Sequence, residues 1–195
     1  MKFFPAIASL FLLTACGNND GKDVTIKDTE SGTTATINMS AIEKAGQDYS
    51  KKVEELQKLT PFTLDELKAF LPETLEGAAR SNMNVSSSMG ISVCSADYEL
   101  DDNSSYSLKI FDCAGEAGAG IYSLQFLTAM NLQQETDVEV TRSIDFGSGK
   151  AVEQYQKDGS ESKLMWMEKD RMMITLEGNN ISMDKVKSVA SGLKF

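Results

Sequence analysis

The spacing of hydrophobic residues changes several times along the chain, and each change marks an expected element. After an apolar run at residues 3–13, residues 18–36 are mostly Gly, Asn, Asp, Ser and Thr. Apolar residues then recur at every third or fourth position over residues 41–59 and over residues 64–71, which predicts two helices. The longer stripe is too short for a stable dimeric coiled coil, so we expect it to pack on its own domain.

Side chains suited to capping precede both helices. Ser40 stands three residues before Glu43, and Thr63 three residues before Glu66, which is the spacing of a capping box. Pro72 then ends the second helix.

From residue 81 onward, apolar and polar residues alternate with a period of two, which predicts strands. Three groups of alternating apolar residues mark a first series: Met83 and Val85; Met89, Ile91 and Val93; Tyr106, Leu108 and Ile110. A second series is expected at residues 137–146, 151–157, 161–169 and 171–177. Residues 115–132 read as a helix between the two series, and Ser182 and Gly192 bound a last helix.

This order of elements predicts an α+β fold with a mainly antiparallel sheet of about six or seven strands and helices packed on it. The strand around Trp166 is apolar on both faces. Leu164 and Trp166 share one face, and Met165 and Met167 share the other, so we expect a central strand covered on both sides.

The first residues have the pattern of a bacterial lipoprotein signal peptide. Lys2 is followed by the apolar run, which is too short to span a bilayer, and then by the small residues Thr14 and Ala15 and by Cys16. This stretch resembles a lipobox, which implies lipidation of the Cys16 thiol and cleavage just before it. Such a lipid would hold the chain to a membrane of the cell envelope. An ordinary secretory signal with an incidental cysteine, or a short buried helix, is the alternative.

The residue after the cysteine indicates the membrane to which a lipoprotein is transferred. Gly17 instead of aspartate predicts the outer membrane under the rule that many lipoproteins follow. Asp20 and Asp23 leave export to the cell surface open.

Three regions follow from these patterns. Residues 1–15 are the expected signal peptide, residues 16–37 a lipid-anchored flexible tether, and residues 38–195 a single domain that includes the two N-terminal helices. A hairpin formed by residues 24–26 and 34–37 is the alternative for part of the tether.

Composition disfavours some classes of partner and of active site. The chain of 195 residues has 19 basic and 29 acidic side chains, a net charge of -10 that becomes -11 when Lys2 leaves with the signal peptide. Such a surface repels nucleic acid, so we expect none as a partner. The chain has no histidine, which disfavours most hydrolase designs and histidine-ligated zinc or copper sites.

Short stretches support a resemblance beyond the lipobox. Residues 67–72, with the sequence LKAFLP, and residues 106–120 resemble an uncharacterised group of small envelope lipoproteins. The order of elements also resembles the PsbP/Mog1-type sandwich. The resemblance implies this fold and no catalytic residue.

Four groups of residues could bind a nucleotide, a metal ion or another ligand. The glycines at residues 115–120 follow a strand and precede a helix, but their spacing is not that of a phosphate loop, which favours close helix packing over nucleotide binding. The methionines Met165, Met167, Met172, Met173 and Met183 could bind Cu(I), but core filling is favoured.

The other two groups are charged. The acidic residues Glu135, Asp137, Glu139, Asp101 and Asp102 lack the spacing of a calcium loop and are expected on the surface. The arginines Arg80, Arg142 and Arg171 could clamp an anion, but ion pairs on the surface are favoured. We therefore expect no metal site and no cofactor.

Cys94 and Cys113 could face each other if the hairpin turn is centred on residues 103–104. A shift of one residue instead matches Tyr98 and Leu100 with Leu108 and Ile110 and puts the cysteines on opposite faces of the sheet. We expect this second arrangement, with two free and largely buried thiols.

Two functions remain. The first is a non-catalytic envelope lipoprotein that binds a partner protein or a small ligand. The second is a histidine-free lipid-anchored enzyme that uses carboxylates or lysine. The first is favoured because no nucleophile and base pair can be assembled.

Overall fold

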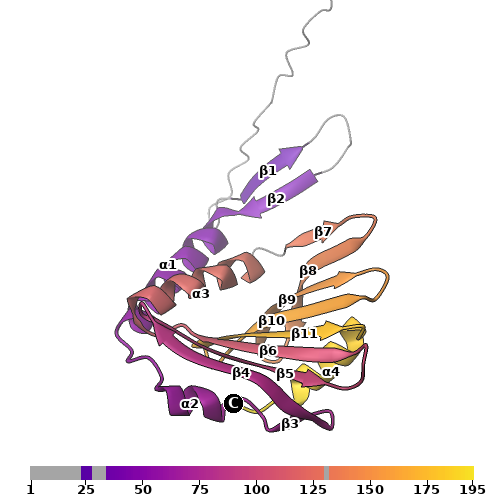
Figure 1. Cartoon of the computed structure of the whole chain (residues 1–195). Coiled ribbons are helices and arrows are strands. Elements are labelled where there is room, and N and C mark those ends of the chain that lie inside the picture. Colours follow the sequence, from indigo (N-terminus) through magenta and orange to yellow (C-terminus); the bar gives the residue numbers. More distant parts are fainter. Residues whose placement is uncertain (1–22, 28–33, 130–131) are drawn as a thin grey trace, which may run out of the picture. The chain divides into compact units, whose positions relative to one another are not determined.

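A computed structural model of the chain describes residues 23–27, 34–129 and 132–195, with side-chain burial for residues 46–122 and 132–195 (Figure 1). It consists of two compact units, residues 1–50 and 51–195. The boundary falls inside helix α1 (Met39–Gln57), whereas the sequence placed the start of the domain at residue 38.

The first unit contains a hairpin within the expected tether. Strands β1 (Asp23–Lys27) and β2 (Thr34–Asn38) pair antiparallel, with Val24 opposite Ile37, and form a sheet of their own. A flexible tether over all of residues 16–37 is therefore wrong for these two segments. Alternating β-branched residues in both segments explain the pairing.

The second unit contains one antiparallel sheet of nine strands in the order β3-β4-β5-β6-β11-β10-β9-β8-β7. Its strands are β3 (Thr74–Leu75), β4 (Ala78–Ser88), β5 (Ile91–Glu99), β6 (Ser105–Asp112), β7 (Gln133–Glu135), β8 (Glu139–Phe146), β9 (Gly149–Gln156), β10 (Glu161–Glu168) and β11 (Met172–Asn179). The expected α+β class is confirmed, but the expected six or seven strands are too few. The strands at the two edges, β3 and β7, are too short to show a period.

The helices match their predictions to within a few residues. Besides α1, they are α2 (Leu64–Ala69), α3 (Gly115–Ala129) and α4 (Met183–Gly192). The capping box of Thr63 and Glu66 is present, and Ser182 caps α4. The box at Ser40 and Glu43 lies outside the described side chains.

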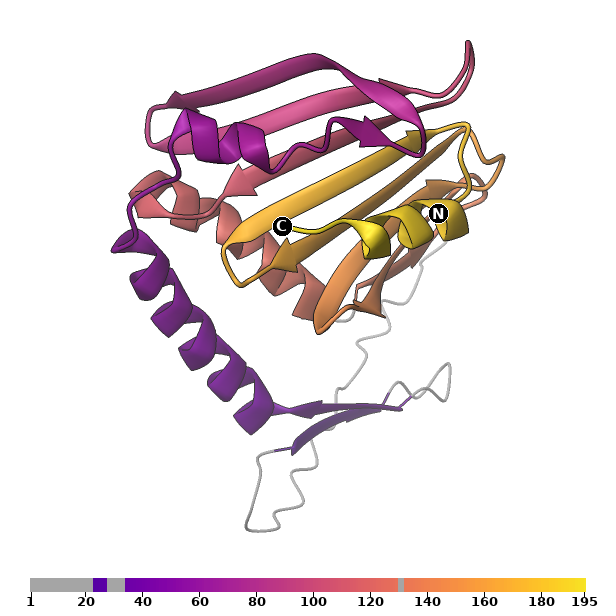
Figure 2. The same ribbon diagram turned by 90° about the horizontal axis from the view of Figure 1, so that it is seen from below.

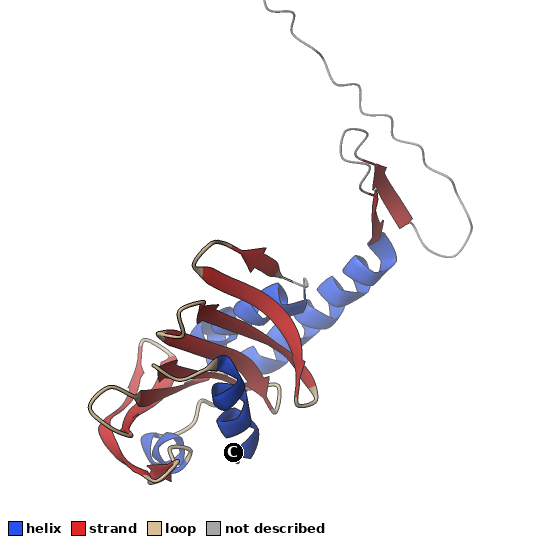
Figure 3. Ribbon diagram, turned by 90° about the vertical axis from the view of Figure 1, so that its right-hand side faces the viewer, coloured by secondary structure: helices blue, strands red, loops and turns tan. Residues whose placement is uncertain are grey.

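Both faces of the sheet are covered, as Figure 2 shows with α2 and α4 in front of the strands and α3 behind them. The larger core lies under α2 and α4 and contains Leu164 and Trp166. The smaller core lies on the opposite face and joins Leu56 of α1 to Ala119 of α3, with Met165 and Met167 packed against it. The prediction of a central strand covered on both sides is confirmed. Figure 3 shows the twist of this sheet between its helices.

The two cysteines are free and buried, as expected, and belong to different cores. Cys94 lies opposite Ile110, and Tyr98 lies opposite Tyr106. The predicted faces are thus right, but the predicted partners of Tyr98 are wrong. The turn is centred on Asp102, because Oδ1 of Asp101 accepts hydrogen bonds from the backbone N–H groups of Asn103 and Ser104.

We expect neither thiol to react in the folded protein near neutral pH, and both to react without reductant once the chain is unfolded. Burial raises the pKa of Cys94 and of Cys113 from 9.0 to about 12, so the reactive thiolate is scarce. Because the folded pKa exceeds the unfolded one, the free energy of unfolding should be unaffected below about pH 9 and fall as the pH rises towards 12.

Thiol titration with and without denaturant checks the first part, and urea unfolding across this pH range checks the second. Thiols that react only after reduction would mean that a disulfide exists and that the described hairpin is wrong.

Candidate binding groove

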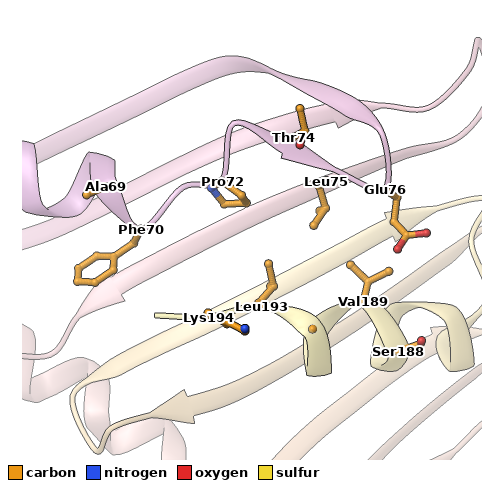
Figure 4. A pocket seen from close by; sticks show the side chains of 11 residues that line it. Ala69, Phe70, Pro72, Thr74, Leu75, Glu76, Ser188, Val189, Leu193 and Lys194 are labelled. Carbon is orange, nitrogen blue, oxygen red and sulfur yellow. The ribbon is translucent and has the colours of Figure 1, made fainter.

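A groove of about 410 Å³ separates the segment after α2 from the C-terminal half of α4. It is lined by Ala69, Phe70, Pro72, Thr74, Leu75, Glu76, Ser188, Val189, Gly192, Leu193 and Lys194. Figure 4 shows Leu75 and Glu76 on the β3 side facing Val189 and Leu193 on the α4 side. Its volume is in the usual range for ligand sites in proteins.

Interactions with the sheet fix the β3 side of this groove. The hydroxyl of Tyr98 donates to the carbonyl of Pro72 at 2.9 Å, and Nη1 of Arg80 donates to the carbonyl of Leu71 at 2.6 Å. At the far end, Lys185 on α4 forms an ion pair with Glu76. The two hydrogen bonds fix the β3 wall on the sheet and the ion pair links the two walls at one end, so the groove is present without a ligand.

β3 is an edge strand, and Thr74 exposes its backbone along the edge. Leu75 and Ala78 close a two-residue turn, and the N–H of Arg80 donates to the carbonyl of Glu73 at 2.9 Å. Hydrogen-bonded and non-hydrogen-bonded pairs alternate in an antiparallel ladder, so the N–H and C=O of Thr74 between them point away from β4. An extended chain laid along β3 could pair with them.

The lining combines apolar walls with a few polar groups. Leu75, Val189 and Leu193 supply the apolar part. Ser188 and Lys194 make no side-chain hydrogen bond or ion pair to the rest of the described chain, and the charge of Glu76 is matched by Lys185. The free charge of the groove is therefore positive. Such a site can bind a ligand, but it has no second carboxylate for acid and base chemistry.

A buried phenol lies close to the Glu76 end. The Tyr106 hydroxyl is buried and has no hydrogen-bond partner among the described residues. Burial raises the pKa of Tyr106, and the nearby Glu76 carboxylate raises it further. This hydroxyl is a polar group without its usual partner.

The glycine-rich segment packs a helix against the sheet. A Cβ on Gly118 would lie 2.8 Å from the backbone oxygen of Asp112, so only glycine lets α3 approach the end of β6 this closely. The strands that follow are antiparallel hairpins. The close packing of this helix on the sheet, which the glycine spacing favoured, is confirmed.

The five methionines do not form one cluster. Met172 and Met183 belong to the larger core, whereas Met165, Met167 and Met173 belong to the opposite one. The sheet separates the two sets, so they cannot share one metal ion. Cysteine, aspartate and glutamate side chains do not gather in groups of three or more that could hold a metal ion within the described residues.

Three of the five acidic residues make local contacts, and the other two, Asp102 and Asp137, are exposed on the surface. A side-chain hydrogen bond from Lys157 lowers the pKa of Glu135, and the backbone N–H of Asn103 lowers that of Asp101. Glu139 accepts hydrogen bonds from Gln154 and Gln156. These contacts stabilise turns and strand pairs.

The three arginines are separate, and two of them pair with carboxylates in the protein interior. Nε of Arg171 lies 2.8 Å from Asp112, and Nε of Arg142 lies 2.5 Å from Glu153, and both carboxylates are fully buried. The expectation of surface pairs is therefore wrong for the acidic partners. Arg80 binds a backbone carbonyl instead. No joint anion clamp exists.

The two buried pairs fasten different elements. Asp112 also accepts from the backbone N–H groups of Phe62 and Ala114, and the guanidinium of Arg171 lies 3.5 Å from the Phe62 ring centroid. Glu153 also pairs with Lys187 of α4 at 3.1 Å. Asp112 thus anchors the loop before α2, and Glu153 anchors α4, which is one wall of the groove.

The sequence analysis missed the groove because its walls come from residues 69–76 and 188–194. The one local signal is Gly77, since glycine is favoured at the second position of a tight hairpin turn; the φ angles of Glu76 and Gly77 are 51° and 88°.

The predicted lipidation site, Cys16, lies outside the described residues. Within the described ranges, no helix combines the length and apolar character needed to span a membrane. Comparisons of the chain with protein-family models, with curated proteins and with solved structures gave no match. The resemblance to small envelope lipoproteins thus remains a prediction.

Proposed function

We propose that this chain is a lipid-anchored protein of the bacterial cell envelope, held at the outer membrane through Cys16, and that its folded domain is a non-catalytic binding module. Lys2, the apolar run at residues 3–13 and the Leu13-Thr14-Ala15-Cys16 stretch support the anchor. The preformed groove between β3 and α4 is the observation that carries the binding role.

The occupant that we propose for the groove is an extended polypeptide segment with an acidic side chain. The free N–H and C=O of Thr74 suit a chain in the strand conformation. Leu75, Val189 and Leu193 suit apolar side chains that alternate along such a chain. Lys194 suits a carboxylate, and this positive charge stands out in a chain of net charge -10.

A histidine-free enzyme is the second candidate. It would require two carboxylates, or a lysine and a carboxylate, that face a bound substrate. Among the groove residues Glu76 is the one carboxylate, and its ion pair with Lys185 ties it to the wall. This arrangement supports binding over catalysis.

The test selects peptides from a random phage-displayed library on the mature chain. We expect the selected peptides to contain acidic and β-branched residues and to lose at least tenfold in affinity for Ser188→Trp, because the indole fills the groove. Ser191→Trp is the matched control, since Ser191 is exposed on the same helix but does not line the groove.

Lys194→Glu should weaken the acidic peptides and leave uncharged ones unaffected. Peptides that bind Ser188→Trp as tightly as the unmodified chain, or a library that yields no groove-dependent binder, would contradict the binding role.

A further inference from the structure

The tip of the β4–β5 hairpin exposes a large apolar side chain. Met89 is 93% exposed, and Ile91 beside it and Met83 on β4 are 37% and 41% exposed. Residues 81–96, the part of this hairpin nearest the tip, contain no charged side chain, although a quarter of the whole chain is charged. The tip is therefore neutral, and Met89 and Ile91 are exposed apolar side chains among serines.

The backbone at this tip is unfavourable for methionine. Met89 and Gly90 have φ angles of 53° and 76°, which are those of a type I′ turn between Ser88 and Ile91. Asn or Asp is favoured at the first position, and other L-residues adopt this conformation at a cost. The other non-glycine residues with positive φ in the described ranges are all polar: Glu76, Asn82, Lys169, Asp170 and Asn180.

Folding therefore does not explain Met89. Its side chain packs on nothing, and asparagine would fit the turn better. A strained residue that contributes nothing to the core indicates a role outside the fold.

A second exposed apolar residue has different surroundings. Val138 is 65% exposed at the β7–β8 turn, but Asp137 and Glu139 flank it. Carboxylates next to Val138 oppose its entry into an apolar phase. Neutral surroundings distinguish the Met89 tip from this turn.

We propose that the β4–β5 hairpin docks on a lipid bilayer, with Met89 inserted among the acyl chains near the head groups. The docking rests on the proposed lipid anchor, which keeps the domain close to a bilayer. Anionic head groups repel an acidic domain, and a neutral tip is the part of it that can enter the interface without a charge penalty.

The apolar contact is too small to hold a free protein on a membrane, but it is enough to orient an anchored one. Transfer of one methionine side chain out of water changes the equilibrium constant between the docked and the free domain by about tenfold to a hundredfold. Because the anchor keeps the domain at the membrane, contact between the hairpin and the bilayer is intramolecular. A change of this size is therefore enough to set the orientation of the domain on the bilayer.

The experiment uses the lipidated mature chain in vesicles of phosphatidylethanolamine with a minority of phosphatidylglycerol. Ser88→Cys places a fluorophore next to Met89, and Asp137→Cys places one at the control turn. Cys94 and Cys113 are buried and should not compete for the label. Iodide quenching from the aqueous phase measures how far each fluorophore is shielded.

We expect the fluorophore at residue 88 to be shielded several-fold better than that at residue 137. Adding Met89→Asn should remove the shielding, with a fall of about tenfold or more in the ratio of docked to free domain. The same substitution should raise the melting temperature, so misfolding cannot account for the loss.

Equal quenching at the two positions, or no effect of Met89→Asn, would overturn the docking and leave the anchor standing. Shielding that requires added envelope proteins would overturn it in favour of a protein partner. A chain that does not float with the vesicles and carries no lipid on Cys16 would overturn the anchor, and the docking with it.

Discussion

Replacing Asp112 with alanine is expected to lower the free energy of unfolding by about 3–5 kcal/mol, the usual cost of breaking a buried ion pair. The carboxylate is fully buried and accepts four hydrogen bonds: two from Arg171, one from the backbone N–H of Phe62 and one from that of Ala114. Its loss leaves a largely buried guanidinium without a counter-ion and two N–H donors without their acceptor. Urea unfolding followed by circular dichroism measures the change.

Asp145→Ala is the matched control. Asp145 also forms an ion pair, with Lys150 at 2.7 Å, but its side chain is 88% exposed. Removing an exposed pair of this kind costs about 0–1 kcal/mol. If the two variants were equally stable, Asp112 would not anchor the loop before α2.

Replacing Cys16 with alanine is expected to move the chain from the membrane fraction to the soluble fraction almost completely. Each buried methylene of an acyl chain contributes about 0.8 kcal/mol, and two or three chains of lipoprotein length make release negligible. Cell fractionation and mass spectrometry of the mature N-terminus measure the effect.

Cys113→Ala is the control, because it removes a thiol that the lipidation machinery does not modify. It should leave the chain in the membrane fraction. An unmodified Cys16 in the original protein, or a Cys16→Ala chain that has lost residues 1–15 and still stays with the membranes, would contradict the anchor.

Local patterns in the sequence predicted most helices and strands because each is set by residues close together in the chain. The capping box at Thr63 and the alternation in β10 are examples. Met89 shows the limit: its place in an alternating series suggested a strand, but Gly90 after it allows the tight turn that the structure has.

Features that depend on distant contacts could not be predicted. Alternation placed the two cysteines on the right faces, but the hairpin register depended on one side chain, Asp101, that caps the turn. The buried partners of Arg142 and Arg171 are Glu153 and Asp112, which lie 11 and 59 residues away in the sequence, so no local pattern pairs them. The groove needs α4 and β3 side by side, and nothing local to either segment predicts that.

The strand order has a consequence for how the chain folds. Strands β3 to β6 follow one another across one half of the sheet, and β7 to β11 across the other half in reverse, so the halves meet where β6 pairs with β11. Tyr106, Leu108 and Ile110 on β6 are fully buried in the finished sheet. Non-local pairing of this kind forms late.

An N-terminal half that has been synthesised as far as β6 would therefore present β6 as an open, apolar strand edge until β11 follows. Unpaired edges of this kind are where chains aggregate. The interval needed to synthesise residues 113–171 is thus the period in which the nascent chain depends most on chaperones, and a chain truncated before β11 should be degraded rather than accumulate.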